Sequence, residues 1–220
     1  MNQIRENTTK ILSDNLFPVV GIGASAGGLD AFKQLIRTIP EDSGMAFILV
    51  QHLDPMHESI LSELLQRVTK IPVLEITDNI NVAPNHIYII PSNKVLIAND
   101  GVLRLSPRGS NGKQHLPIDI FFNSLADIHR SHAIGIVLSG TGVDGTAGLS
   151  AIKDQGGITI AQDIATAAYP GMPQNAIDAG VANCILPPEK IIDKLVEMAA
   201  ALTLVSPGKI EEGHRVPREN

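Results

Sequence analysis

The sequence predicts an α/β fold of three layers (α/β/α), with a doubly wound, mostly parallel sheet at its centre and an antiparallel hairpin as an appendage. Three observations support this prediction. Short apolar runs alternate with amphipathic stretches along most of the 220 residues, which is typical of repeated βαβ units. Hydrophobic residues make up 44% of the chain and aromatic residues only 3%, so the core must be largely aliphatic, as in sheets covered on both faces. Between residues 79 and 105 this alternation gives way to a hairpin pattern.

The first part of the chain predicts a βαβ unit. Apolar runs at 17–22 and 45–51 are expected to be buried strands, and the amphipathic stretch 28–38 between them, closed by Pro40, is expected to be a helix. Two strands joined in this way should be parallel, with a right-handed crossover. The elements expected next are a helix at 58–68 and a strand near 72–76.

The middle of the chain predicts the appendage. Residues 86–90 are strand-like, and the runs 95–98 and 102–105 flank Asn99-Asp100-Gly101, which favours a tight turn between two antiparallel strands. We therefore expect an antiparallel unit attached to the parallel sheet. Residues 106–115 are rich in Ser, Pro, Gly and Asn and are expected to form a loop that overhangs the sheet edge.

The second half of the chain returns to alternating strands and helices. Pro117 suits the first turn of a helix over 117–129. The elements expected after it are a strand at 133–138, a helix at 146–155, a strand at 158–162, a loop at 163–173, a short helix ending at Gly180, a strand at 182–186 and a closing helix at 188–202. The predicted organisation is an N-terminal arm at 1–16, a folded domain at 17–203 and a flexible C-terminal tail at 204–220.

Charge and composition exclude several classes of protein. The formal net charge is −6 and no basic run is present, which argues against a nucleic-acid partner or an anionic membrane surface. The one cysteine, Cys184, cannot form an internal disulfide and is expected to be a core thiol. The N-terminus is polar, and no apolar run is long enough to cross a bilayer. We expect a soluble, cytoplasmic protein that is not inserted in a membrane.

A glycine-rich turn follows the first predicted strand and admits two interpretations. Gly23-Ala24-Ser25-Ala26-Gly27 fits the G-x-S-x-G pattern, which presents a serine hydroxyl at the carboxyl edge of a sheet. Gly21 and Gly23 followed by Gly27 also resemble a dinucleotide-binding turn. A dinucleotide site needs an acidic residue at the end of the second strand, where this chain has Gln51 and His52. The pattern therefore favours a nucleophilic serine and leaves nucleotide binding as an alternative.

Three residues at the ends of predicted strands could form a catalytic triad. Ser25 and His52 follow parallel strands and should emerge at the same sheet edge, where His52 could act as the base. Asp144, in a glycine-rich loop with Thr141, could orient that base, and the loop resembles a nest of N–H groups for an oxyanion. Alternatively, Asp144 could cap the helix that begins near residue 146, and His52 could be a polar residue at a strand end.

A metal site is a further alternative. His52, Asp54 and His57 are of ligand type, but Pro55 interrupts the regular helical spacing that would bring the side chains to one face. We therefore expect no metal here.

Seven ordered motifs resemble the catalytic domain of the chemotaxis protein-glutamate methylesterases, the CheB family. These motifs are GIGASAGG at 21–28, QHLDP at 51–55, PNHIY at 84–88, HLPID at 115–119, LSGTGVDG at 138–145, AQD at 161–163 and GMP at 171–173. The resemblance extends over roughly residues 17–202, nearly the whole chain, and identifies the predicted domain at 17–203 as a CheB-type catalytic domain.

The resemblance implies a serine hydrolase that removes methyl esters from glutamate side chains of chemoreceptors, often with deamidation of glutamines. It implies Ser25 as nucleophile, His52 as base and Asp144 as orienting carboxylate, with an oxyanion and substrate loop that includes Ala26, Thr141, Gly142 and Met172. The implied partners are the methylated cytoplasmic region of chemoreceptors and a receptor methyltransferase, and no cofactor is needed.

The chain departs from the chemotaxis enzymes at several points. Ala26 stands where they commonly have Thr, and Thr141 where many have Met. Only about sixteen residues precede the first predicted strand, too few for a receiver domain, which argues against control by phosphorylation in cis. The motifs are closer to those of esterase domains fused to receptor methyltransferases and kinases. A non-catalytic or weakly catalytic docking module on the same fold is therefore an alternative function.

Overall fold

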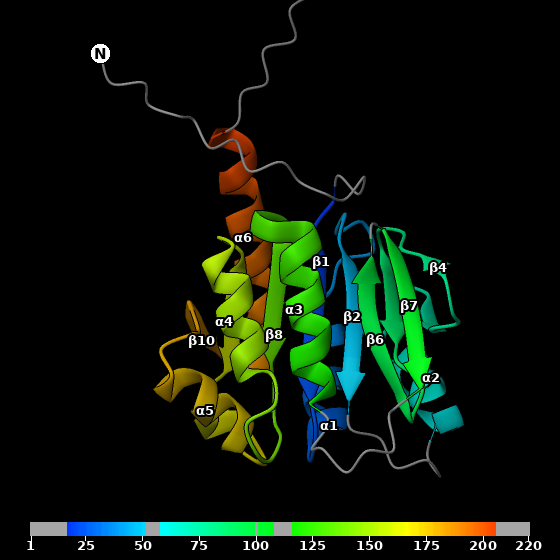
Figure 1. Ribbon diagram of the computed structural model, residues 1–220, viewed down its shortest axis with the longest axis horizontal. Coiled ribbons are helices and arrows are strands. Elements are labelled where there is room, and N and C mark those ends of the chain that lie inside the picture. The colour runs from blue at the N-terminus through cyan, green and yellow to red at the C-terminus, as the bar shows by residue number, and fades with distance from the viewer. Residues whose placement is uncertain (1–16, 52–57, 100, 108–115, 206–220) are drawn as a thin grey trace, which may run out of the picture.

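The structure is a computed structural model that describes residues 17–51, 58–99, 101–107 and 116–205. A seven-stranded sheet forms the middle layer, helices cover both of its faces, and a three-stranded sheet lies at one side (Figure 1). This arrangement confirms the predicted three-layer α/β/α architecture. Within the described ranges, no helix combines the length and apolar character that a bilayer span requires.

The central sheet is parallel throughout. Its strand order is β10-β9-β8-β1-β2-β5-β3, and each neighbouring pair runs in the same direction. The strands are β1 (Val19–Ala24), β2 (Ala46–Gln51), β3 (Val73–Glu75), β5 (His86–Ile89), β8 (Ala133–Val137), β9 (Ile158–Gln162) and β10 (Cys184–Leu186). The chain passes from β1 to β2 on one side and later returns to β8 on the other, so the strand order reverses at β1. In open α/β sheets, such a reversal is where sites form.

In the described ranges, three helices cover each face of this sheet. They are α1 (Gly28–Ile36), α2 (Glu58–Gln66) and α6 (Pro188–Val205) on one face, and α3 (Pro117–His129), α4 (Thr146–Asp154) and α5 (Gly171–Asp178) on the other. Phe32 of α1 and Ile192 of α6 belong to one buried apolar cluster, whereas Phe122 of α3 and Leu149 of α4 belong to a second. Figure 1 shows α3 and α4 in front of the sheet and α6 behind it.

The antiparallel appendage is a separate small sheet. β6 (Lys94–Asn99) and β7 (Val102–Pro107) form the predicted hairpin, and β4 (Ile80–Asn81) pairs with the other edge of β7. Leu96 and Leu103 are buried in the same cluster as α3, and the Ala98 N–H donates to Ser124 Oγ of α3 at 2.9 Å. The appendage therefore packs on the same side as α3.

Glycines in the central strands let α3 and α4 lie close to the sheet. A Cβ at Gly21 would stand 2.8 Å from a ring carbon of Phe122, and one at Gly23 would overlap Ile118. A Cβ at Gly135 of β8 would stand 2.6 Å from Leu149 of α4. Gly21 and Gly23, which the dinucleotide interpretation placed in a phosphate-binding turn, therefore lie in β1 and face α3.

Several predicted elements differ from the structure. The strand expected within the appendage at 86–90 is β5, which pairs in parallel with β2 and β3 in the main sheet. The loop expected at 163–173 contains η3 (Ile164–Thr166) and the first turn of α5, where Pro173 is tolerated because a first-turn N–H has no helical acceptor. α6 continues to Val205, three residues beyond its predicted end. Cys184 is half-buried rather than fully in the core.

Candidate functional site

The turn after β1 holds Ser25 at the carboxyl edge of the sheet. Its backbone N–H donates to Ser139 O at 3.0 Å, and its carbonyl accepts the Gly28 N–H at 2.9 Å. Gly27, the N-cap of α1, has a φ of 71°, a left-handed conformation that favours glycine. A Cβ at Gly27 would also stand 2.7 Å from Ser139 Oγ. The half-buried Ser25 is thus fixed between the end of β1 and the start of α1.

The loop after β8 lies directly beside Ser25. β1 and β8 are neighbouring parallel strands with Gly23 opposite Val137, so the segments that follow them meet at one edge. A Cβ at Gly140 would stand 3.0 Å from Ser25 Cβ and would overlap Met172 Sδ. Ser25 and Met172 therefore both pack closely against Gly140, where a side chain does not fit.

The start of α5 supports the other side of this loop. Met172 is fully buried, and its N–H donates to Gly140 O at 2.9 Å. Asn175 Nδ2 donates to Gly142 O at 2.9 Å and to Gly171 O at 2.7 Å. The structure therefore brings Ser25, Gly142 and Met172 into one site, although they lie far apart in the sequence.

Two of the predicted oxyanion donors lie at the rim of this site. Thr141 is exposed at the tip of the loop, and Ala26 is half-buried in the turn after Ser25. Among the described residues, the backbone N–H groups of Ala26 and Thr141 have no hydrogen-bond acceptor. Both groups could therefore donate to a bound oxygen atom.

Asp144 is buried, with a side chain that is 2% exposed, and it binds the N-terminus of α3. Its Oδ1 accepts the Asp119 N–H at 2.9 Å, and its Oδ2 accepts the Ile118 N–H at 3.1 Å. The interpretation that Asp144 caps the helix beginning near residue 146 is wrong. The N-cap of α4 is Gly145, which has a left-handed φ of 92°. The carboxylate caps a helix that precedes it in the sequence.

Asp119 is a second buried carboxyl group beside Asp144. Its Oδ1 accepts the Gly148 N–H of α4 at 2.7 Å. Burial raises the pKa of Asp119 above its usual value, and the nearby Asp144 carboxylate acts in the same direction, whereas the hydrogen bond from Gly148 lowers it. Asp119 belongs to the motif at 115–119, but sequence reasoning gave it no role.

Ser139 and Gln162 are two further buried polar residues that sequence reasoning missed. Each is 1% exposed, and the Ser139 N–H donates to Gln162 Oε1 at 2.8 Å. Their position in the sequence could have indicated them, because each is a polar residue at the carboxyl end of a buried apolar strand. Both lie near the predicted site.

Some predicted residues lie outside the described part of the chain. His52, with Asp54 and His57 of the alternative metal cluster, falls within the undescribed range 52–57. In the ranges that the structure does describe, no group of three or more His, Cys, Asp or Glu side chains is arranged to hold a metal ion.

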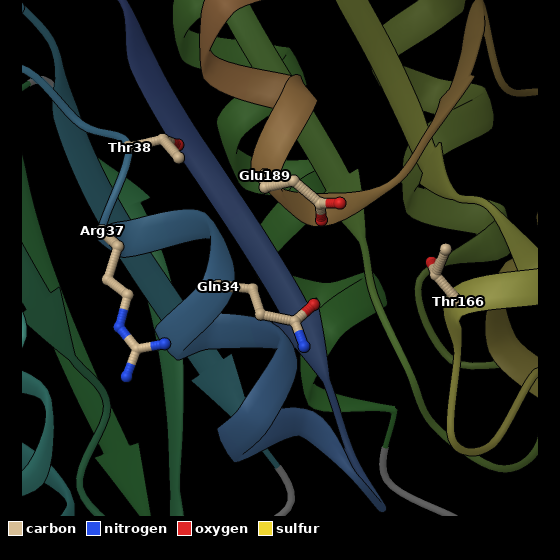
Figure 2. A pocket seen from close by; sticks show the side chains of 5 residues that line it. All are labelled: Gln34, Arg37, Thr38, Thr166 and Glu189. Atoms are coloured by element: carbon tan, nitrogen blue, oxygen red, sulfur yellow. The ribbon is translucent and has the colours of Figure 1, made fainter.

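A cavity of about 510 Å³ opens elsewhere in the described part of the chain. Its lining side chains come from α1 and the two residues after it, from η3 and from the start of α6, as Figure 2 shows. They are Gln34, Arg37, Thr38, Thr166 and Glu189. None of the predicted site residues that the structure describes lines it. The cavity therefore lies outside the part of the site formed by Ser25, Gly140 and Met172.

Comparison with known proteins gives consistent results. The family model described as CheB methylesterase matches residues 20–195. A Burkholderia lata protein named protein-glutamate methylesterase/protein-glutamine glutaminase 2 is 40% identical over 186 residues, covering 81% of this chain and 53% of that protein. A protein of the same name from Pseudomonas aeruginosa is 33% identical over 186 residues, covering 83% of this chain and 53% of that protein. The chain therefore spans about half the length of these curated relatives.

A solved structure extends the comparison to three dimensions. The crystal structure of the Thermotoga maritima CheB methylesterase catalytic domain matches with a TM-score of 0.76 and 31% sequence identity. The match covers 83% of this chain and 98% of that domain. The similarity thus extends over nearly the whole of a solved catalytic domain.

Proposed function

The chain belongs to the CheB methylesterase family, and from that membership we propose that it is a serine hydrolase that removes methyl esters from glutamate side chains. The names of its relatives also include protein-glutamine glutaminase, so the proposal extends to deamidation of glutamine. The proposed substrate is the methylated cytoplasmic region of chemoreceptors or of similar signalling proteins. A receptor methyltransferase is a second proposed partner, and the cytoplasm is the proposed location.

One observation carries this proposal most directly: the packing of Ser25 against the loop after β8. Gly140 lies against Ser25 Cβ, and the Ser25 N–H is bonded to Ser139 O, so a serine hydroxyl and a glycine-rich loop share one edge of the sheet. Acyl transfer by a serine needs this combination of a nucleophile and nearby N–H donors.

In the proposed mechanism, Ser25 Oγ attacks the ester carbonyl carbon while His52 takes the hydroxyl proton. Asp144 orients the imidazole of His52 and stabilises its positive charge. The N–H groups of Ala26 and Thr141 stabilise the oxyanion, and the N-terminus of α1 adds its positive dipole end. Collapse of the intermediate breaks the bond to the methoxy group, which leaves as methanol with the proton from His52.

The second half of the reaction regenerates the enzyme. Water attacks the acyl carbon on Ser25 Oγ while His52 takes a proton from the water, and collapse returns that proton to Ser25 Oγ. The product is a free glutamate carboxylate. Deamidation follows the same path, with ammonia in place of methanol.

The direct test is substitution of the nucleophile. Ser25→Ala should lower methanol release from a methylated chemoreceptor cytoplasmic fragment by about a thousand-fold or more, because the covalent path is lost. His52→Ala should have a similar effect, and the double variant should lose little more, since the two residues act as a unit. Circular dichroism should show unchanged folding.

Two outcomes would contradict the proposal. Undiminished methanol release from Ser25→Ala would remove the serine from the mechanism. Tight binding of the receptor fragment by the wild-type chain, without methanol release, would favour the alternative of a docking module.

A further inference from the structure

Ser139 connects the nucleophile turn to the rest of the site. Its carbonyl accepts the Ser25 N–H at 3.0 Å, and its hydroxyl donates to Ala26 O at 2.9 Å. The same hydroxyl accepts the Tyr169 N–H at 3.0 Å. One residue therefore holds both ends of the Ser25-Ala26 dipeptide and also the loop between β9 and α5.

These two attachments hold the backbone on both sides of the peptide group in between. The Ser25–Ala26 peptide carries the Ala26 N–H, and its carbonyl accepts the Gly28 N–H at 2.9 Å, which sets its orientation. The Ser25 N–H and the Ala26 carbonyl belong to the flanking peptide groups, and both are bonded to Ser139. Ser139 thus fixes the position of the Ala26 N–H relative to the loop after β8.

The backbone of Ser139 is held in turn by Gln162. The backbone N–H of Ser139 donates to Gln162 Oε1 at 2.8 Å, and Gln162 Nε2 donates to Thr166 Oγ1 at 3.2 Å. Ser139 and Gln162 are each 1% exposed, so water cannot readily replace the hydrogen bond between them. Buried polar networks of this kind fix a unique geometry when every member is satisfied.

We propose that Ser139 is a positioning residue whose hydroxyl, through its hydrogen bond to Ala26 O, holds the turn that carries Ser25 and the Ala26 N–H in the geometry needed for attack on the substrate. This inference rests on the proposed function of Ser25. Loss of the hydroxyl leaves Ala26 O and the Tyr169 N–H without their partner and frees the turn to shift. Small displacements of a nucleophile or an oxyanion donor lower the rate of reaction strongly.

The chain offers a matched control in Ser124. Its hydroxyl donates to Phe121 O at 2.7 Å and accepts the Ala98 N–H at 2.9 Å, so it makes the same two kinds of hydrogen bond. Ser124 lies on α3 against the small sheet. Ser124→Ala therefore removes equivalent hydrogen bonds at a place outside the site.

The experiment compares Ser139→Ala, Ser139→Cys and Ser124→Ala in the full chain. Ser139→Ala should lower kcat for the methylated receptor fragment by about 10- to 100-fold while KM changes by less than about three-fold, because alignment and not binding is lost. Ser139→Cys, with a weaker donor, should fall between wild type and Ser139→Ala, and it replaces that variant if Ser139→Ala does not fold. Ser124→Ala should lower the melting temperature without lowering kcat.

A second substrate separates this inference from the proposed function. Release of nitrophenolate from p-nitrophenyl acetate reports acylation of Ser25 directly, with Ser25→Ala as the blank. If the wild type acylates but releases no methanol from the receptor fragment, the methylesterase proposal fails, and the acylation rates of the Ser139 variants still test the inference. Equal rates for Ser139→Ala and Ser124→Ala would overturn it, as would the absence of Ser25-dependent acylation in the wild type.

Discussion

Asp119 and Asp144 connect α3 and α4 through two hydrogen bonds. The Asp119 N–H of α3 donates to Asp144 Oδ1 at 2.9 Å, and Asp119 Oδ1 accepts the Gly148 N–H of α4 at 2.7 Å. The carboxyl group before α4 thus caps α3, and the carboxyl group at the start of α3 binds the first turn of α4. Two buried carboxyl groups therefore link the helices next to the site.

The raised pKa of Asp119 predicts a pH-dependent stability. A carboxyl group with a higher pKa in the folded state binds its proton more tightly there, so its contribution to stability falls as pH rises from its unfolded pKa through its folded pKa. Asp119→Asn stays neutral and still offers an oxygen to the Gly148 N–H. We expect the free energy of unfolding of this variant, relative to wild type, to increase with pH across that window.

Urea unfolding between pH 4 and 8 measures this difference. Asp127→Asn is the control, because Asp127 lies on the exposed side of the same helix. If the free energy of unfolding of Asp119→Asn, relative to wild type, fell as pH rose, the folded protein would favour the ionised form of Asp119.

Asp144 should contribute to both stability and catalysis. Asp144→Ala removes the acceptors of two buried N–H groups, those of Ile118 and Asp119, and should lower the free energy of unfolding by about 1–3 kcal/mol. If Asp144 also orients His52, kcat for methanol release should fall at temperatures where the variant is fully folded. Loss of stability with an unchanged kcat would restrict Asp144 to its capping role.

The contact between Gly140 and Met172 can be tested by a double-mutant cycle. Gly140→Ala places a methyl group on Met172 Sδ and should lower the free energy of unfolding by about 1–3 kcal/mol through overpacking. Met172→Ala leaves a cavity and should cost about 2–5 kcal/mol. The double variant should lose less stability than the sum, because the new methyl group occupies part of that cavity.

Thermal or urea unfolding of the three variants gives the coupling energy. Strict additivity would mean that the methyl group at position 140 is accommodated in another direction.

Patterns of neighbouring residues predicted the helices and strands whose ends are marked by the residues at those ends. The helix predicted at 117–129 is α3, because Pro117 marks its start and its apolar residues recur with the helical period. The strand predicted at 158–162 is β9. The place of β5 was not predictable in this way, since an apolar run does not specify its partner strands.

The contacts within the site were less predictable than the identities of its residues. The motifs indicated Ser25, Gly142 and Met172, and the structure brings them together at one edge. The capping of α3 by Asp144 was missed because the two segments are joined only in the folded chain, 25 residues apart, whereas α4 lies next in sequence. The role of His52 stays a prediction, since residue 52 lies outside the described ranges.

The two outer strands of the central sheet, β3 and β10, are only three residues long each. An added strand from another molecule could form few main-chain hydrogen bonds at either border, so the sheet is a poor template for aggregation. We therefore expect the proposed protein substrate to be recognised by side chains and loops at the end of the sheet and not by addition of a strand at its borders.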